Sequence, residues 1–212
     1  MPKTNPDVRG ESSVKEWYRN YYSKSGLDRN DIRLNPGVLF QILAAEAAFV
    51  AAIREVERNP STAKVLDVGC GSGGDMFQLF RIGYLPENVY GVDIQRERLE
   101  AGKNLCHLVN FLSEDASKMS FNSDYFDLVF ESTMFATLPD DKVRAGIASE
   151  MMRVCKSGGH LLLLDWRTHK PGDSNYKALS RRELQKLFKV GVDTEVYNRR
   201  EKLDHFLGRP KV

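Results

Sequence analysis

The sequence contains few cysteines and no long apolar run. Three cysteines, at positions 70, 106 and 155, occur among 212 residues and form no CxxC pair, so neither a disulfide framework nor a zinc cage is expected. The longest apolar runs, 43–53 and 161–164, fall well short of the roughly 20 residues that span a bilayer. The first residues, MPKTNPDVRG, lack the apolar core of a signal peptide. These absences predict a soluble cytoplasmic protein without a metal site.

The sequence also has no large excess of positive or negative residues. The 31 basic and 29 acidic residues give a formal net charge of +2, and no dense block of Lys and Arg occurs, so nucleic acid is not an expected partner. Hydrophobic residues make up 42% and charged residues 28% of the chain, as in an ordinary globular protein. A length of 212 residues suits one α/β domain and is short for two.

Two patterns follow one another along the chain. Residues 12–57 show helical spacing of apolar side chains, interrupted by a turn-rich stretch at 23–37. From Lys64 onward short apolar strands alternate with helices, which predicts an α/β fold with a mainly parallel sheet covered on both faces. We therefore expect a helical extension or lid over residues 1–60 and the sheet domain over 61–212. Strands are expected at 64–68, 88–93, 108–112, 126–131, 160–165 and 192–197, and helices at 38–58, 74–82, 96–105, 140–155 and 180–189.

A glycine-rich segment follows the first expected strand. It reads VLDVGCGSGG over residues 65–74. Glycines let the chain turn sharply and let a ligand approach the backbone beside the start of a helix. Gly69, Gly71 and Gly74 also fit the GxGxxG spacing of dinucleotide-binding loops, and a tight turn without a ligand is the plainer alternative.

Two acidic residues help to choose the ligand. Asp93 ends the second expected strand, at a spacing from the glycines that suits hydrogen bonds to both ribose hydroxyls of an adenosine-containing ligand. Asp67 lies inside the first strand, where a loop that binds pyrophosphate gains nothing from a negative charge. A carboxylate there suits a ligand with an ammonium group, which favours S-adenosylmethionine (SAM) over NAD. Asp67 could also satisfy nearby loop amides, and the two roles are compatible.

Four segments over residues 64–166 resemble, in order, the motifs of the class I SAM-dependent methyltransferases: VLDVGCGSGG, VYGVDI, SEDASKMSFNSDYFDLVFES and EMMRVCKSGGHLLLLDW. The resemblance implies a Rossmann-like fold and SAM as cofactor. It also implies a set of cofactor-binding residues: Asp67, Gly69, Gly71 and Gly73 around the methionine portion, Asp93 at the ribose, Ile94 and Ala116 beside the adenine, Asp115 at the adenine amino group, and Glu131 at the mouth of the site.

The sequence departs from the family pattern at three places, one of which, Ser157 in place of a Pro before the fifth strand, the neighbouring glycines make tolerable. Many small-molecule members carry a His after the fourth strand, whereas residues 135–139 read FATLP, so no general base is expected there. The family also ends its sheet with an antiparallel hairpin. Residues 192–197 suit its first strand, but the tail 201–212, with Pro210 and little alternation, is a poor second strand. This leaves the last position of the sheet in doubt.

Candidates for the acceptor side come from three segments. His169, in the loop after the fifth strand, is the best-placed histidine for a catalytic base, although a solvated loop position is the plainer explanation. An aromatic group on one helix face could form a lid over SAM and substrate, or could anchor the extension to the sheet domain; its members are Trp17, Tyr18, Tyr21 and Tyr22. Arg29 and Arg33 could bind the SAM carboxylate or an acidic substrate, or stabilise a turn.

The extension gives the most specific hypothesis about the acceptor. Residues 16–41 resemble methyltransferases found with bacterial surface-polysaccharide genes, which implies O-methylation of a sugar or glycan hydroxyl. We therefore predict a SAM-dependent methyltransferase for a small polar acceptor. The alternatives are a small-molecule N- or C-methyltransferase and a SAM-binding protein without catalysis. Asp67 and the FDLVF and KSGG segments speak against an NAD-dependent oxidoreductase.

Overall fold

The computed structural model describes residues 33–34, 36–56, 59–138, 140–167 and 177–188, and the backbone of residues 195–198 and 203–208. The chain divides into two compact units, Met1–Ala44 and Ala45–Val212. Helix α3 (Pro36–Val56) runs across this division. The first helix expected from the sequence, before residue 33, lies outside the described residues. The predicted extension over residues 1–60 therefore stays a prediction.

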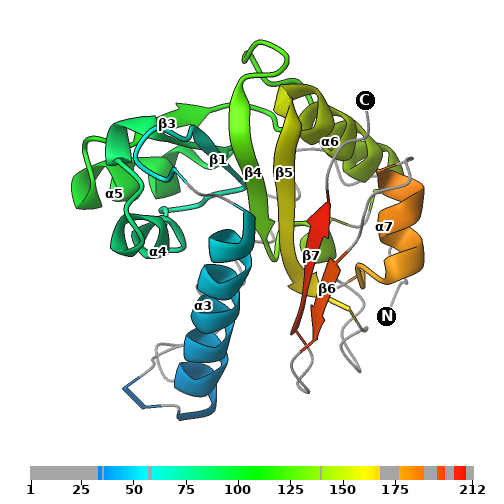
Figure 1. Ribbon diagram of the computed structural model, residues 1–212, viewed down its shortest axis with the longest axis horizontal. Helices are drawn as coiled ribbons and strands as arrows, with labels where there is room; N and C mark the ends of the chain where they lie inside the picture. The colour runs from blue at the N-terminus through cyan, green and yellow to red at the C-terminus, as the bar shows by residue number, and fades with distance from the viewer. Residues whose placement is uncertain are drawn as a thin grey trace, which may run out of the picture. The chain divides into compact units, whose positions relative to one another are not determined.

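The larger unit is built on a seven-stranded sheet with the order β3-β2-β1-β4-β5-β7-β6 (Figure 1). The strands are β1 (Val65–Val68), β2 (Val89–Asp93), β3 (Asn110–Ser113), β4 (Phe126–Ser132), β5 (Cys155–Trp166), β6 (Glu195–Asn198) and β7 (Leu203–Gly208). Strands β1 to β5 are parallel, whereas β7 runs antiparallel to β5 and β6 antiparallel to β7. The predicted Rossmann-like α/β fold is confirmed.

The tail of the chain does form a strand, which corrects the doubt about the last position of the sheet. Strand β7 pairs with β5 from Leu161↔Gly208 to Trp166↔Leu203, and its other edge pairs with β6. Because β7 has a partner on each side, backbone hydrogen bonds can hold it although its side chains alternate poorly. Pro210 lies beyond its last residue and so does not interrupt the ladder.

The helices of the larger unit begin close to the positions that the sequence predicts. They are α4 (Met76–Arg81), α5 (Arg96–Leu105), α6 (Asp141–Val154) and α7 (Arg181–Leu187). Asp140 caps α6, since its carboxylate accepts hydrogen bonds from the amides of Lys142 and Val143, at 2.7 and 3.2 Å. Ser180 caps α7 in the same way, through the amide of Glu183 at 3.3 Å.

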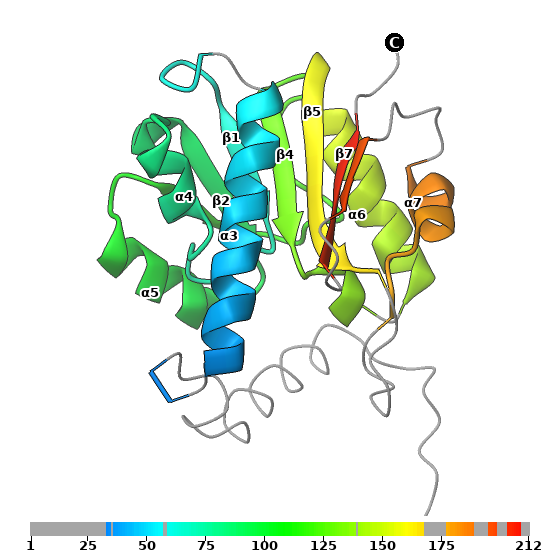
Figure 2. The same cartoon turned by 60° about the horizontal axis from the view of Figure 1, so that its bottom comes forward.

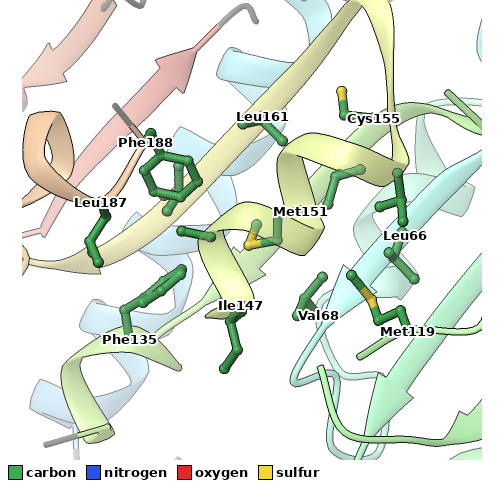
Figure 3. Close-up of a cluster of buried hydrophobic side chains, with 14 of the residues drawn as sticks. Leu66, Val68, Met119, Phe135, Ile147, Met151, Cys155, Leu161, Leu187 and Phe188 are labelled. Atoms are coloured by element: carbon green, nitrogen blue, oxygen red, sulfur yellow. The ribbon is translucent and has the colours of Figure 1, made fainter. Parts of the chain in front are cut away.

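Two buried cores lie on opposite faces of the sheet, because successive side chains of a strand point to opposite sides. Leu66 and Val68 of β1 join the core that α6 and α7 cover, and Val65 joins the other. Figure 3 shows Ile147 and Met151 of α6 within the first core, and α6 and α7 lie together on one side of the strands in Figures 1 and 2. The second core is formed with three sets of helix residues: Met76 and Leu79 of α4, Leu99 of α5, and Phe49, Ala52 and Ile53 of α3.

None of the helices in the described part of the chain has the length and apolar character that crossing a membrane requires.

Candidate functional site

The residues predicted to bind a cofactor follow four neighbouring strands at one edge of the sheet. Parallel strands place their carboxyl ends at the same edge, and ligands of open α/β sheets bind there. The glycine loop follows β1, Asp93 ends β2, Asp115 follows β3, and Glu131 lies near the end of β4. The structure therefore brings the predicted cofactor residues to one edge of the sheet.

Neither of the first two glycines of the loop can be replaced by a residue with a side chain without strain. Gly69 and Gly71 have φ angles of 76° and 55°, which L-residues with a side chain rarely adopt. A Cβ on Gly71 would collide with the guanidinium of Arg98, and one on Gly69 would lie 2.8 Å from Met134 Sδ. The amides of Gly69 and Cys70 donate to the carbonyl of Val92, at 2.8 and 3.1 Å, and so tie the loop to β2.

Asp93 holds the glycine loop by a hydrogen bond and can still accept hydrogen bonds from a ligand. Its Oδ2 accepts a hydrogen bond from the amide of Gly71 at 2.9 Å, and its Oδ1 accepts one from the amide of Gln95 at 2.8 Å. A carboxylate offers about four lone-pair sites, so each oxygen can accept a further bond. Two ribose hydroxyls would use this remaining capacity.

Asp67 is a buried carboxylate that the described residues do not fully satisfy. It is 2% exposed, and its Oδ2 has no hydrogen-bond partner among them. Burial raises the pKa of Asp67 well above its ordinary value, and the negative charges of Asp75 and Asp93 raise it further. A ligand ammonium group would satisfy the orphaned oxygen and stabilise its charge. The site therefore fits the methionine end of SAM.

Asp75 adds to the negative character of this end of the site. It immediately precedes α4, and burial raises its pKa while a hydrogen bond from Ser132 lowers it. The negative charges of Asp75 and Asp93 both raise the pKa of Asp67, so the three carboxylates interact electrostatically. Such a set of carboxylates suits a ligand that carries positive charge, as SAM does on its amine and its sulfur.

The residues expected at the adenine lie beyond β2 and β3. Ile94 and Ala116 are half-buried, and Ala116 packs against the core on the α6 side of the sheet. Asp115 is exposed, and its Oδ1 accepts hydrogen bonds from the amide and the hydroxyl of Ser117, at 2.8 and 2.7 Å. These bonds form a local turn that fixes the Asp115 side chain. Contact of these residues with the adenine stays a prediction.

Glu131 is fully buried and holds the segment that follows β4. We call residues Thr133–Leu138 the post-β4 loop. Glu131 Oε2 accepts a hydrogen bond from the amide of Met134 at 2.9 Å, and the amide of Phe135 lies at 3.5 Å. Burial and the neighbouring charge of Asp165 raise the pKa of Glu131 well above its ordinary value. Its Oε1 has no partner in the described part of the chain.

Two further buried charges, Asp165 and Arg144, lie close to the post-β4 loop and were not selected from the sequence. Asp165, 4% exposed, accepts hydrogen bonds from the amides of Ala136 and Trp166, at 2.8 and 2.6 Å. Arg144 of α6 is fully buried, with its guanidinium carbon 6.0 Å from the centre of the Phe135 ring. An acidic residue ending the apolar run LLLLD is a usable signal for Asp165. Arg144 is one of three basic residues of α6, with Lys142 and Arg153, and nothing in the sequence sets it apart from them.

Most of the residues expected on the acceptor side lie outside the described residues. Arg33 is exposed and belongs to the smaller unit. His169 and the residues Trp17, Tyr18, Tyr21, Tyr22 and Arg29 lie outside the described residues. The catalytic base and the aromatic lid therefore stay predictions. Cys70, Cys106 and Cys155 are free thiols, and no group of three or more His, Cys, Asp or Glu side chains in the described ranges is arranged to hold a metal ion.

Known proteins share this pattern. Residues 65–159 match the family described as "Methyltransferase domain". The 2-methyl-6-phytyl-1,4-hydroquinone methyltransferase of Synechocystis is 31% identical over 139 residues, which cover 62% of this chain and 42% of that protein. The chloroplastic tocopherol O-methyltransferase of Arabidopsis thaliana is 29% identical over 149 residues, which cover 68% of this chain and 42% of that protein.

A solved structure agrees over a larger part of the chain. The magnesium protoporphyrin IX methyltransferase of Synechocystis with bound SAM aligns at a TM-score of 0.66 and 18% identity, covering 98% of this chain and 100% of that one. At this identity the likeness establishes the fold. Residues 65–159 thus match a methyltransferase domain, and this match together with the fold supports SAM as the cofactor of the site. The two relatives methylate a hydroquinone and tocopherol, so they give no support to the resemblance to surface-polysaccharide methyltransferases.

Proposed function

We propose that this chain, which carries a class I methyltransferase domain, transfers the methyl group of SAM to a small organic acceptor. The observation that carries the proposal is the orphaned, buried Oδ2 of Asp67 beside the glycine loop, with Asp93 fixed next to it. The matched segment covers less than half of each relative named above, so activity and acceptor are proposals for this chain.

The role of this chain's residues is to bind SAM and to orient it toward the acceptor. When bound, SAM supplies a methyl group on a positively charged sulfur, which an acceptor nucleophile can attack. Asp67 would balance the ammonium group, and Asp93 would hold the ribose hydroxyls. Since the described part of the site offers no His after β4, its contribution is to align the reactants and to keep water out, which alone can accelerate a reaction strongly.

The acceptor we favour is neutral and largely apolar. The partly exposed side chains of the post-β4 loop carry no ionisable group, so they suit an acceptor without charge; they are Thr133, Met134, Thr137 and Leu138. A hydroquinone and tocopherol, the compounds in the names of the two relatives, are of this kind. The sugar or glycan hydroxyl predicted from residues 16–41 is the second candidate, and N- or C-methylation of another small molecule is the third.

Transfer of a labelled methyl group from SAM separates these acceptors. The purified chain is incubated with neutral hydroquinones in one arm and with nucleotide sugars in the other. We expect label in a hydroquinone product, and the Asp93→Ala variant serves as the control without cofactor binding. Label in a sugar supports the second candidate. Binding of SAM without transfer to any acceptor would favour a SAM-binding protein without catalysis.

A further inference from the structure

The post-β4 loop is tied to two buried carboxylates from neighbouring strands. Glu131 of β4 accepts the amide of Met134 at 2.9 Å, and Asp165 of β5 accepts the amide of Ala136 at 2.8 Å. The amide of Thr133 donates to the carbonyl of Leu164 at 2.7 Å. With the Phe135 amide, 3.5 Å from Glu131 Oε2, all of the first four amides of the loop therefore end on β4 and β5, close to their carboxyl ends.

The loop holds a backbone conformation that needs such support. Thr133 has a φ of 59°, in the left-handed region that β-branched residues rarely adopt. A conformation of this kind persists where the surroundings fix it, and such residues gather at functional sites. The hydrogen bonds to Leu164, Glu131 and Asp165 surround Thr133 and provide that support.

Arg144 supplies the positive charge of this cluster. Asp165 lies on the same face of β5 as Leu161 and Leu163, the face that α6 covers. The guanidinium of Arg144 is fully buried, without a hydrogen-bond partner among the described residues, and its Nη1 lies 3.7 Å from Glu183 Oε2. Asp165, Glu131 and Asp141 are its other electrostatic neighbours. Buried ions of this kind add little to stability compared with apolar side chains of equal volume, so another role is expected.

The loop reaches the cofactor loop through one side chain. A Cβ on Gly69 would lie 2.8 Å from Met134 Sδ and 3.0 Å from its Cγ, so the Met134 side chain packs directly on the first glycine. Gly69 follows β1 two residues after Asp67, at the end of the site that suits the methionine portion of SAM. Any shift of the post-β4 loop therefore changes the wall of the cofactor site.

We propose that Asp165 is a positioning residue that holds the post-β4 loop so that Met134 forms the wall of the SAM site over Gly69. Asp165 touches neither cofactor nor acceptor in this account and acts through the loop. The inference rests on the proposed function, because it requires that SAM binds at the glycine loop.

The substitution Asp165→Asn tests this with little change in shape. Asp165 uses one oxygen for Ala136 and the other for Trp166, whereas an Asn has a single acceptor oxygen and turns its NH₂ group toward the second amide. Asp127→Asn is the matched control. Asp127 also accepts a backbone amide, that of Lys64 at 2.8 Å, but it lies near the amino end of β4.

Two readouts separate a positioning role from a merely structural one. Hydrogen exchange of the Ala136 or the Trp166 amide should become at least about tenfold faster in Asp165→Asn, and both should stay unchanged in Asp127→Asn, as expected for the loss of one hydrogen bond to the side chain. The Kd for SAM should rise by a similar factor in Asp165→Asn alone. In the background of Met134→Ala, Asp165→Asn should no longer change the Kd, because the side chain through which it acts is absent.

The outcomes are distinguishable. If the wild-type chain binds no SAM, the proposed function fails and this inference fails with it. If the wild type binds SAM and Asp165→Asn binds it equally well, or if its effect persists undiminished with Met134→Ala, the inference alone is overturned. Should Asp165→Asn fail to fold, Glu131→Gln gives the same test at the Met134 amide, with the same expectations.

Discussion

At the residue scale, three carboxylates at the edge of the sheet are buried in different ways. Asp93 is satisfied by the amides of Gly71 and Gln95, and Asp165 by those of Ala136 and Trp166. Asp67 keeps an oxygen without a partner among the described residues. A satisfied carboxylate shapes the site, whereas an unsatisfied one waits for a ligand. Asp67 is therefore the carboxylate of the three that most directly requires a bound ligand.

Binding of SAM is expected to release protons. Burial raises the pKa of Asp67 in the free protein, and a ligand ammonium group next to Oδ2 would stabilise the ionised form and lower that pKa again. A pKa that falls on binding means that protons leave, so SAM affinity should rise with pH. Calorimetric titration in two buffers of different ionisation enthalpy gives the number of protons. Asp67→Asn should abolish the release, and wild-type binding without any release would contradict this role of Asp67.

Asp93 should be required for cofactor affinity. The change Asp93→Ala removes the acceptor for two ribose hydroxyls and also the bond that ties Gly71 to β2. Two lost hydrogen bonds to a charged group weaken binding by about a hundredfold or more. Titration with SAM measures the effect, with Asp127→Ala as a control that alters a carboxylate near the amino end of β4. Equal affinity in Asp93→Ala would mean that the ribose binds elsewhere.

At the scale of elements, the glycine loop should distinguish two glycines that the sequence treats alike. A Cβ on Gly71 would require a strained backbone and would displace Arg98. Gly74 has an ordinary backbone conformation, and the described residues place no atom within 4 Å of a Cβ there. We expect Gly71→Ala to weaken SAM binding at least about tenfold, since ordered backbone and side chains must both move, while Gly74→Ala changes it little. Similar losses in both variants would show that the loop is not held as described.

The elements also show what sequence patterns can predict. Helix α5 begins and ends at the predicted residues because its apolar spacing and flanking strands are regular. The glycine loop and Asp93 were identified because their chemistry depends on local spacing. Strand β7 was underestimated because its pairing with β5 and β6 is a long-range interaction that side-chain alternation does not reveal. Arg144 was missed for a similar reason, since its burial arises only when α6, α7 and the post-β4 loop pack together.

At the scale of the whole molecule, the family match ends before β5 is complete, at residue 159, and the structure extends the same fold through β6 and β7. The larger unit, Ala45–Val212, therefore contains the entire sheet on which the site is built. Because the glycine loop, Asp93 and the post-β4 loop come from distant parts of the sequence, a bound cofactor joins segments that must all be folded.

Cofactor binding should accordingly stabilise the folded chain. SAM at about one hundred times its Kd should add about 2.7 kcal/mol to the free energy of unfolding, provided that the unfolded chain does not bind it. Thermal denaturation with and without SAM measures the shift, and Asp93→Ala should lose most of it. A wild-type chain whose unfolding temperature is unaffected by saturating SAM would argue against a site formed by the folded unit.

The most direct test of the central claim is calorimetric titration of the purified chain with SAM, S-adenosylhomocysteine and NAD. The account predicts saturable binding of SAM and S-adenosylhomocysteine and no heat from NAD, because Asp67 lies where a pyrophosphate would be repelled and an ammonium group attracted. Binding of NAD alone, or no binding of SAM by a folded sample, would contradict it.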